Sequence, residues 1–566
     1  MNIVRRAPPT TGGLEECVSH DLIRGILLSR GVSGRSEVEL SLHDLLHFRT
    51  LAGIEKGAEL LADAIAAGLR IGIAGDYDVD GMSGTALGVL ALRALGAAEP
   101  VWHVPSRYNG GYGLSPQSVS SLHERGARLL ITVDNGITAC EAVEQARSLG
   151  LPVIITDHHD CPPQLPQAAA VINPRQPGCA FPSKHLAGVG VLFYLLAAAR
   201  SRLSARGFYP DGAPGLSGFL DLVALGTIGD LAELDANNRR LVHAGLERMR
   251  RGTMQAGLRA LLQVAGRAPD EISTSTLAFE ICPRLNSAMR LHLDHNPAMD
   301  CLLATDPQVA LELARELDYC NRRRTDHQRV MYETALELAQ AQDDGHSALV
   351  ICDDSFLSGF TGLVAGQLQE RFARPCFVFA AHGGVLTGSG RCSGGLELSA
   401  LLQQLEERCP GLMLRHGGHA QAAGVTLEAG RLPEFTARFR ELAAAGDQQA
   451  PSPHLVSDGE LPDECCCLEF ARQLMRYGPY GRGFEEPCFD GVFEVESAYV
   501  VGGRHLSVRL RRRSGAMHGM LFRAAPEQLS LRPGTLVQVL YSVGVGYYQH
   551  RPRFEVRISH LERVSG

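Results

Sequence analysis

Between about residues 51 and 232, short apolar runs alternate with segments of helical pattern. Runs that are apolar along their whole length and separated by helices indicate a parallel sheet covered on both faces. In such sheets ligands bind at the carboxyl ends of the strands, so the residues that follow each run are the first candidates for a functional site. The five expected strands are IGIAG (71–75), VWHV (101–104), LLITV (129–133), VIIT (153–156) and AAVIN (169–173).

Acidic residues and histidines gather after three of these runs. Buried carboxylates repel one another and take up protons unless a cation is present, so a divalent metal ion would remove the conflict. Mixed Asp and His ligands suit Mn²⁺ or Mg²⁺, and two such ions would support in-line displacement at phosphorus. Any one of these residues alone is more often a turn or capping residue, but their convergence on one sheet edge favours a metal site. The clusters are GDYDVDG (75–81) with Asp76, Asp78 and Asp80, DNG (134–136) with Asp134, DHH (157–159), and Asp230 in GTIGDLAEL at the end of an apolar helix.

Beyond this core the sequence pattern changes three times. Residues 236–340 look helical and end in a long, charged, amphipathic stretch. A second α/β unit follows, with strands ALVICD (348–353) and CFVFA (376–380) and glycine-rich stretches after them. Residues 443–454 have linker composition, and the short alternating runs that follow indicate a small antiparallel barrel.

We therefore expect an α/β fold with a C-terminal β-barrel. A parallel-sheet catalytic domain is followed by a helical connector, a second α/β domain and an OB-like barrel. The expected ranges are 1–50 for an N-terminal segment, 51–235 for the catalytic core, 236–345 for the helical region and connecting helix, 346–445 for the second α/β domain and 455–566 for the barrel.

The composition is that of an ordinary globular chain. Its 566 residues, 45% hydrophobic and 20% charged, are enough for several cores. The fifteen cysteines show no C-x-x-C spacing, which suits reduced thiols better than a disulfide framework or a zinc site. The longest apolar segment, residues 187–199, is shorter than the roughly 20 residues of a membrane span. We expect a cytoplasmic protein without membrane attachment, and a monomer, because no coiled-coil heptads appear.

The barrel sequence concentrates positive charge, although the whole chain has a net charge of −8. In HLSVRLRRR, every second residue is apolar, and Arg509 and Arg511 fall on the opposite face of the strand. Tyr548 offers a stacking surface nearby. Basic charge with aromatic rings is how OB-type barrels hold single strands. A solvated strand face explains the pattern equally well, so the residues alone leave both interpretations open.

An ordered set of motifs resembles the DHH phosphoesterase superfamily. GDYDVDGMSGTAL, SRYNGGYGLS, ITVDNGI, TDHHD and LVALGTIGDLAEL follow one another in that order, and GSGR (388–391) and GGHAQAAG (417–424) resemble its DHHA1 partner domain. With PRLN (283–286) and the barrel, the chain from about residue 45 onward resembles the RecJ family of single-strand-specific DNA exonucleases. That resemblance implies a 5′-to-3′ exonuclease with two Mn²⁺ or Mg²⁺ ions, which hydrolyses single-stranded DNA to 5′-mononucleotides in DNA repair and recombination. It also implies a single-strand-binding protein and a helicase as partners.

The resemblance assigns roles to individual residues. The matched metal ligands are Asp78, Asp80, Asp134, His158 and Asp230, with Asp134 shared by both ions and Asp76 in the same motif. His159 matches the position that faces the scissile phosphate, and Asp157 the one that orients a histidine. The matched substrate contacts are Arg284, Asn286, Arg391, Gly418 and His419, to which the barrel adds Arg509, Arg511 and Tyr548. The chain departs from the family pattern at two places. The family usually has a glycine in the segment after PRLN, where this chain has LNSAMRL with Met289. A serine often follows the arginine of GSGR, where this chain has Cys392.

Two other functions fit parts of the sequence. A DHH phosphodiesterase acting on short oligoribonucleotides or cyclic dinucleotides would share the motifs, as would an inorganic pyrophosphatase, but residues 455–566 would then have no task. A non-catalytic DNA-binding repair scaffold would share the fold. Relatives of that kind lose metal ligands, and this chain has kept them.

Overall fold

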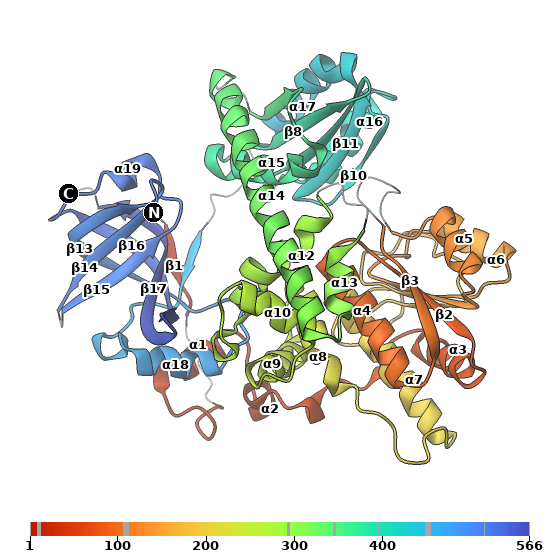
Figure 1. Ribbon diagram of the computed structural model, residues 1–566. Coiled ribbons are helices and arrows are strands. Elements are labelled where there is room, and N and C mark those ends of the chain that lie inside the picture. Colours follow the sequence, from red (N-terminus) through yellow and green to blue (C-terminus); the bar gives the residue numbers. More distant parts are fainter. Residues whose placement is uncertain are drawn as a thin grey trace. The chain divides into compact units, whose positions relative to one another are not determined.

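The computed structural model describes residues 2–7, 13–105, 113–290, 295–342, 347–392, 396–447, 454–513 and 515–564. These form two compact units (Figure 1). The first contains Met1–Met289, His295–Glu316 and His454–Gly566, and the second contains Arg290–Asp294 and Leu317–Pro453. Among the described residues, no helix has both the length and the apolar character needed to cross a membrane.

The first unit contains the expected parallel sheet. Its strand order is β3-β2-β4-β5-β6, and every neighbouring pair is parallel. The three central strands are buried almost throughout, which is why they are apolar along their length. The strands are β2 (Arg70–Gly75), β3 (Ala98–His103), β4 (Leu129–Val133), β5 (Val153–Thr156) and β6 (Ala170–Ile172). The expected α/β fold and all five expected strands are confirmed.

Helices cover both faces of this sheet. One face packs against α5 (Pro116–Glu124) and α6 (Cys140–Ser148). The other packs against α3 (Ile54–Ala66), α4 (Val79–Ala94) and α7 (Gly188–Ala205), and α8 (Leu220–Gly229) lies against α4 and α7. Helix α7 is buried on nearly all sides, which explains its unbroken apolar sequence.

The region after this core is helical, as expected. Its helices are α9 (Ala236–Arg250), α10 (Ala256–Val264), α11 (Thr274–Thr276), α12 (Cys282–Ala288), α13 (Pro297–Leu303) and the 35-residue α14 (Pro307–Ala341). A π-helical turn over Leu277–Ile281 joins α11 to α12.

The second unit is a mixed sheet of order β10-β11-β9-β8-β7, against which helices and the later part of α14 pack. Its strands are β7 (Leu349–Asp353), β8 (Cys376–His382), β9 (Val385–Arg391), β10 (Arg415–Gly418) and β11 (Ala422–Glu428), and its helices are α15 (Thr361–Phe372), α16 (Leu398–Arg408) and α17 (Leu432–Asp447). The glycine-rich stretches, which the sequence did not identify as strands, form β9, β10 and β11. A Cβ at Gly388 or Gly390 would lie 2.4 Å from the ring of Phe379 or Phe377, so these glycines make room for two core aromatics.

The C-terminal strands close a five-stranded barrel, which confirms the expected OB-like architecture. The barrel order is β13-β14-β15-β17-β16, antiparallel except for the β15–β17 pair. The alternating pattern predicted neither β15 nor its parallel pairing with β17. The strands are β13 (Cys488–Val501), β14 (His505–Arg512), β15 (Gly515–Leu521), β16 (Leu536–Tyr548) and β17 (Arg551–Arg563), with α18 (Leu468–Arg476) before them and α19 (Pro526–Leu529) between β15 and β16.

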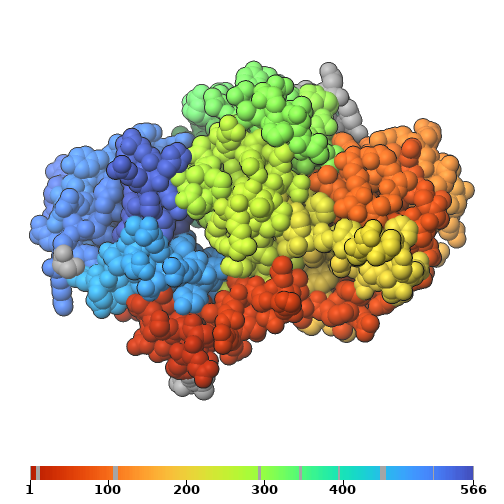
Figure 2. All heavy atoms as spheres, turned by 60° about the horizontal axis from the view of Figure 1, so that its bottom comes forward, coloured from red at the N-terminus to blue at the C-terminus, as the bar shows by residue number. Residues whose placement is uncertain are grey.

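The N-terminal segment packs against the segment that leads into the barrel, as Figure 2 shows for the red and light-blue residues. Strand β1 (Ile3–Arg5) pairs in parallel with β12 (Leu455–Ser457). Arg30, near the end of α1 (Asp21–Leu28), forms a bidentate ion pair with Asp458 in which both distances are 2.8 Å. Both side chains are buried, so this ion pair links the N-terminal segment to the segment that leads into the barrel, within the first unit.

Candidate metal centre and nucleic-acid interface

The sequence-predicted ligands converge at the carboxyl edge of the first sheet. Three overlapping groups of residues each bring ligand atoms within 4.8 Å of one another. They come from the ends of β2, β4 and β5 and from the residue that ends α8. The groups are Asp76, Asp78 and Asp134; Asp134, His158 and His159; and Asp80, His158 and Asp230.

The helix ends at this edge fix two of the carboxylates. Asp78 is the N-cap of α4, and its Oδ1 accepts hydrogen bonds from the backbone N–H groups of Asp80 and Gly81 at 2.9 and 3.1 Å. Asp80 is buried and accepts from the N–H groups of Gly188 and Val189, at 2.6 and 2.9 Å, at the start of α7. The unsatisfied amides of two helix N-termini therefore orient the acidic side chains.

Asp134 occupies the centre of the cluster and has an unusual backbone. Its φ is 63°, in the left-handed region that residues other than Asn, Asp and Gly rarely adopt. Its Oδ1 lies 2.9 Å from Nε2 of His158 and 3.9 Å from Nδ1 of His159. Asp134 belongs to two of the three groups, which makes it the carboxylate that links them.

Asp157 lies beneath the histidine pair and positions His159. It is buried, and its Oδ1 contacts Nδ1 of His159 at 2.8 Å and accepts from the backbone N–H groups of His158 and His159. Its Oδ2 accepts from the N–H of Ile137 at 2.9 Å. Burial alone would lower the pKa of His159, but the hydrogen bond to Asp157 and the nearby carboxylates outweigh it and raise that pKa to about 9.

The acidic cluster is electrostatically unfavourable by itself. Burial, followed by repulsion from neighbouring carboxylates, raises the pKa of both Asp80 and Asp230 to about 7 and raises that of Asp134 well above its usual value. Carboxylate oxygens and imidazole nitrogens make up all three groups found among the described residues, with no thiolate. This donor set fits a hard divalent cation such as Mn²⁺ or Mg²⁺.

We predict that Mn²⁺ binding releases protons at pH 7, because burial and neighbouring carboxylates raise the pKa of Asp80 and Asp230 to about 7, so these carboxyl groups hold protons that a bound cation displaces. Apparent affinity should rise with pH between 6 and 8, and fewer protons should be released at pH 8. Titration calorimetry in two buffers of different ionisation enthalpy measures the number of protons released when Mn²⁺ binds. Asp230→Asn should lower that number, and identical heats in both buffers at pH 7 would contradict the prediction.

Comparison with known proteins agrees with this arrangement. The DHH family N-terminal domain model matches residues 70–227, the DHHA1 domain model 347–445 and the RecJ OB domain model 457–560. The chain is 40% identical over 551 residues to the single-stranded-DNA-specific exonuclease RecJ of Escherichia coli (strain K12), with 95% of each protein covered. The chain belongs to the RecJ family. The RecJ of Dickeya dadantii (strain 3937) is also 40% identical, over 99% of this chain and 100% of that protein.

Solved structures of the RecJ family have the same fold. The crystal structure of RecJ from Thermus thermophilus in complex with Mn²⁺ matches with a TM-score of 0.80 and 30% sequence identity, over 96% of this chain and 76% of that chain. A complex of the same protein with Mg²⁺ matches with a TM-score of 0.73. The resemblance inferred from the ordered motifs is therefore confirmed.

The other predicted contacts divide between the two units. Arg284 and Asn286 are half-buried on α12 in the unit that holds the metal centre. In the second unit, Arg391 ends β9 opposite Ala422 of β11, and the N–H of His419 donates to the carbonyl of Ala422 at 2.7 Å. Gly418, Arg391 and His419 therefore lie at one end of that sheet. Most of SRYNGGYGLS, residues 106–112, lies outside the described residues.

The outer face of the barrel carries the predicted arginines and two aromatic residues that were not among the predicted contacts. Leu506, Val508 and Leu510 are buried, as the alternation predicted, and Arg509 and Arg511 are exposed. On the same outer face, Tyr499 is 67% exposed on β13 and Phe522 is 57% exposed after β15. The guanidinium of Arg553 lies 5.7 Å from the ring centre of Tyr548. Tyr499 stands in the alternating run FEVESAYVV, so the period-2 pattern could have identified it.

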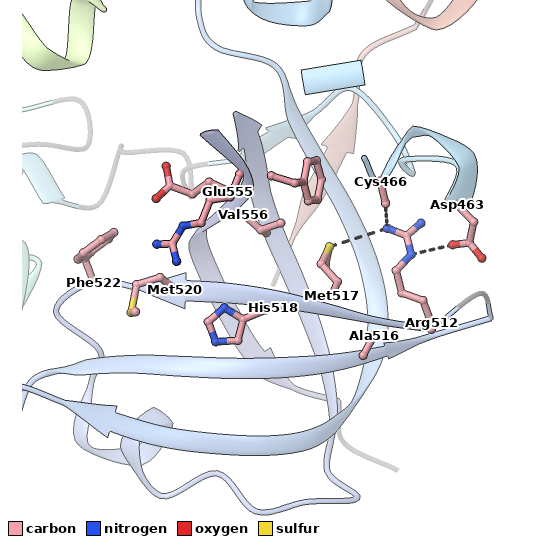
Figure 3. A pocket seen from close by; sticks show the side chains of 13 residues that line it. Asp463, Cys466, Arg512, Ala516, Met517, His518, Met520, Phe522, Glu555 and Val556 are labelled. Carbon is pink, nitrogen blue, oxygen red and sulfur yellow. Dashed lines mark hydrogen bonds and ion pairs between the residues drawn. The ribbon is translucent and has the colours of Figure 1, made fainter. Parts of the chain in front are cut away.

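A groove of about 500 Å³ runs beside β15 on this face (Figure 3). Ala516, His518, Met520 and Phe522 follow one another along one side, and Glu555 and Val556 of β17 lie across from them. Arg512 lies at one end, where it pairs with Asp463 at 2.7 Å. Residues 488–563 contain eleven arginines and six carboxylates, a net charge of +5 in a chain of −8. Positive charge with exposed aromatic rings is the composition of a surface for single-stranded nucleic acid.

Proposed function

We propose that this chain is a metal-dependent exonuclease that hydrolyses single-stranded DNA from the 5′ end and releases 5′-mononucleotides. The observation that carries the proposal is the set of three ligand groups, each linked to another by Asp134 or His158, in a chain of the RecJ family. Paired divalent ions suit hydrolysis of a phosphodiester bond. The basic, aromatic outer face of the barrel supports a single strand as substrate.

The residues of the metal centre have distinct tasks in this proposal. Bound Mn²⁺ or Mg²⁺ would supply Lewis acidity that makes a water nucleophilic and stabilises charge on the phosphate. Asp76, Asp78, Asp80, Asp134, His158 and Asp230 would hold the ions. Asp157 fixes the ring of His159 through the 2.8 Å contact with Nδ1, so His159 would stabilise negative charge that develops on the phosphate.

The substrate contacts are proposed on the positions that match the family motifs. Arg284 and Asn286 would contact the nucleotide, and Arg391, Gly418 and His419 would contact phosphate. Arg509, Arg511 and Tyr548 would hold the strand on the barrel. The action of the chain as a cytoplasmic monomer, in repair and recombination with a helicase and a single-strand-binding protein, is a proposal that rests on the family alone.

The test is direct cleavage of labelled DNA. With Mn²⁺ or Mg²⁺, single-stranded DNA labelled at the 5′ end should release labelled mononucleotide in the first turnovers, whereas 3′-labelled DNA should shorten gradually. Duplex DNA with blunt ends is the matched substrate control and should stay intact. Binding without cleavage would favour a repair scaffold, and cleavage confined to short oligoribonucleotides or cyclic dinucleotides would favour a small-substrate phosphodiesterase. Either result would overturn the proposal.

A further inference from the structure

Two carboxylates lie among the arginines of the barrel's outer face. Glu496 lies 2.9 Å from Arg509 and 3.4 Å from Arg511, and Glu494 lies 2.9 Å from Arg511. The pairing of β13 with β14 places Glu494 opposite Arg511, and an irregularity in the register falls between Val495 and Ser497. Glu494 and Glu496 are two residues apart on β13, so both side chains face the side of the sheet that carries Arg509 and Arg511.

These ion pairs are open to water. The side chains of Arg509 and Arg511 are 60% and 56% exposed, and those of Glu496 and Glu494 are 27% and 36% exposed. Ion pairs of this exposure contribute little to folding stability because water screens them. They also break at little cost, so another anion can replace the carboxylates on the guanidinium groups.

We propose that Glu494 and Glu496 compete with the phosphates of single-stranded DNA for Arg509 and Arg511, and so set how tightly the barrel holds the strand. The inference rests on the proposed function. A phosphate that binds Arg509 displaces the Glu496 carboxylate from the guanidinium group. The negative charge of Glu496 then repels that phosphate at short range.

This competition has a use in an exonuclease. The strand advances by one nucleotide for each phosphodiester bond that is hydrolysed, so every contact between an arginine and a phosphate must break and form again. Arginines that pass between a carboxylate and a phosphate are never left unpaired during that step. The barrel then guides the strand without holding it in one place.

The test removes the two negative charges and keeps the side-chain size. We expect Glu494→Gln combined with Glu496→Gln to tighten single-stranded DNA binding about tenfold, which corresponds to about 1.4 kcal/mol. The plot of log affinity against log salt should steepen by up to about 1.4, since each neutralised phosphate of a single strand contributes about 0.7. Fluorescence anisotropy without divalent metal measures both quantities and leaves the DNA intact.

A matched control separates local competition from net charge. Glu144 and Glu441 are exposed and lie 2.7 and 3.1 Å from Arg147 and Arg438, on α6 and α17. Glu144→Gln with Glu441→Gln changes the net charge equally and should leave affinity and salt dependence unchanged. Equal tightening by both double variants, or by neither, would overturn the competition. Arg509→Gln should also cost more affinity in the Glu494→Gln, Glu496→Gln background than in wild type.

The binding assay needs no catalysis, so its outcome is separate from the fate of the proposed function. With Mn²⁺ and enzyme in excess over a long single strand, we expect the double variant to release nucleotides more slowly than wild type, while hydrolysis of a dinucleotide is unchanged. An unchanged or faster rate on the long strand, with tighter binding, would refute the part of the inference that concerns movement of the strand.

Discussion

Asp134→Asn is expected to abolish nuclease activity while the metal-free protein becomes no less stable. The side chain lies between two of the three ligand groups, so its charge is needed to hold cations there. Removal of one preorganised group that stabilises charge at a reacting centre costs on the order of 10²–10³ in rate, and we expect a loss of at least about 10³-fold because two of the three ligand groups contain this carboxylate. Asn tolerates the left-handed backbone that Asp134 adopts, so the substitution keeps the local conformation.

The stability part of this prediction follows from the pKa shifts. Burial and neighbouring carboxylates raise the pKa of Asp134, Asp80 and Asp230, so the folded metal-free protein binds protons more tightly than the unfolded chain. Such groups stabilise the fold at low pH, and that stabilisation is lost as pH rises through the folded pKa, about 7 for Asp80 and Asp230. In EDTA, the melting temperature of wild type should therefore fall as the pH rises from about 5 towards 7, and that of Asp134→Asn should fall less.

Thermal melts and the 5′-label assay check both parts. Mn²⁺ should raise the melting temperature of wild type and leave that of the variant nearly unchanged. Retention of more than about a tenth of the wild-type rate by Asp134→Asn would remove Asp134 from the metal centre. A variant that is inactive but strongly destabilised in EDTA would point instead to a structural role.

The sequence predicted the first sheet because its strands are buried on both faces. A strand such as LLITV, which forms β4, then has no polar face, and its apolar run stands out. The strands of the second unit gave a weaker signal, since Gly388 and Gly390 replace the inward-facing apolar residues of β9. Glycine is needed at these two positions because the rings of Phe377 and Phe379 on β8 pack against them. This is a contact between strands, which no local sequence pattern encodes.

The candidate site was predictable for a similar reason. Carboxyl ends of parallel strands meet at one edge, so the residues after β2, β4 and β5 had to approach one another. The sequence could not predict the pairing of Arg509 and Arg511 with Glu494 and Glu496, because that contact depends on the register of β13 against β14. A one-residue change in register would turn the carboxylates to the other face.

Gly188→Ala should disable the metal centre without changing any ligand. A Cβ at Gly188 would lie 2.6, 2.7 and 2.8 Å from the Cβ, Cα and N atoms of Asp134, which cannot move aside like the end of a flexible side chain. The same residue donates its N–H to Asp80. The added methyl should cost about 1–3 kcal/mol in the free energy of unfolding, and displacement of Asp134 or Asp80 by about 1 Å should cost about 10² in rate.

Gly190→Ala is the matched control, two residues further along α7. There the nearest contact of an added Cβ is the end of the Leu186 side chain at 3.2 Å, which has to give way by only a few tenths of an ångström. We expect near-wild-type activity and Mn²⁺ affinity from this variant, and weakened Mn²⁺ binding with low activity from Gly188→Ala while circular dichroism still shows a folded protein. Equal activity of the two variants would mean that the approach of α7 to Asp134 does not determine the geometry of the site. If Gly188→Ala loses Mn²⁺ affinity and activity and Gly190→Ala does not, the start of α7 positions the carboxylates for metal binding.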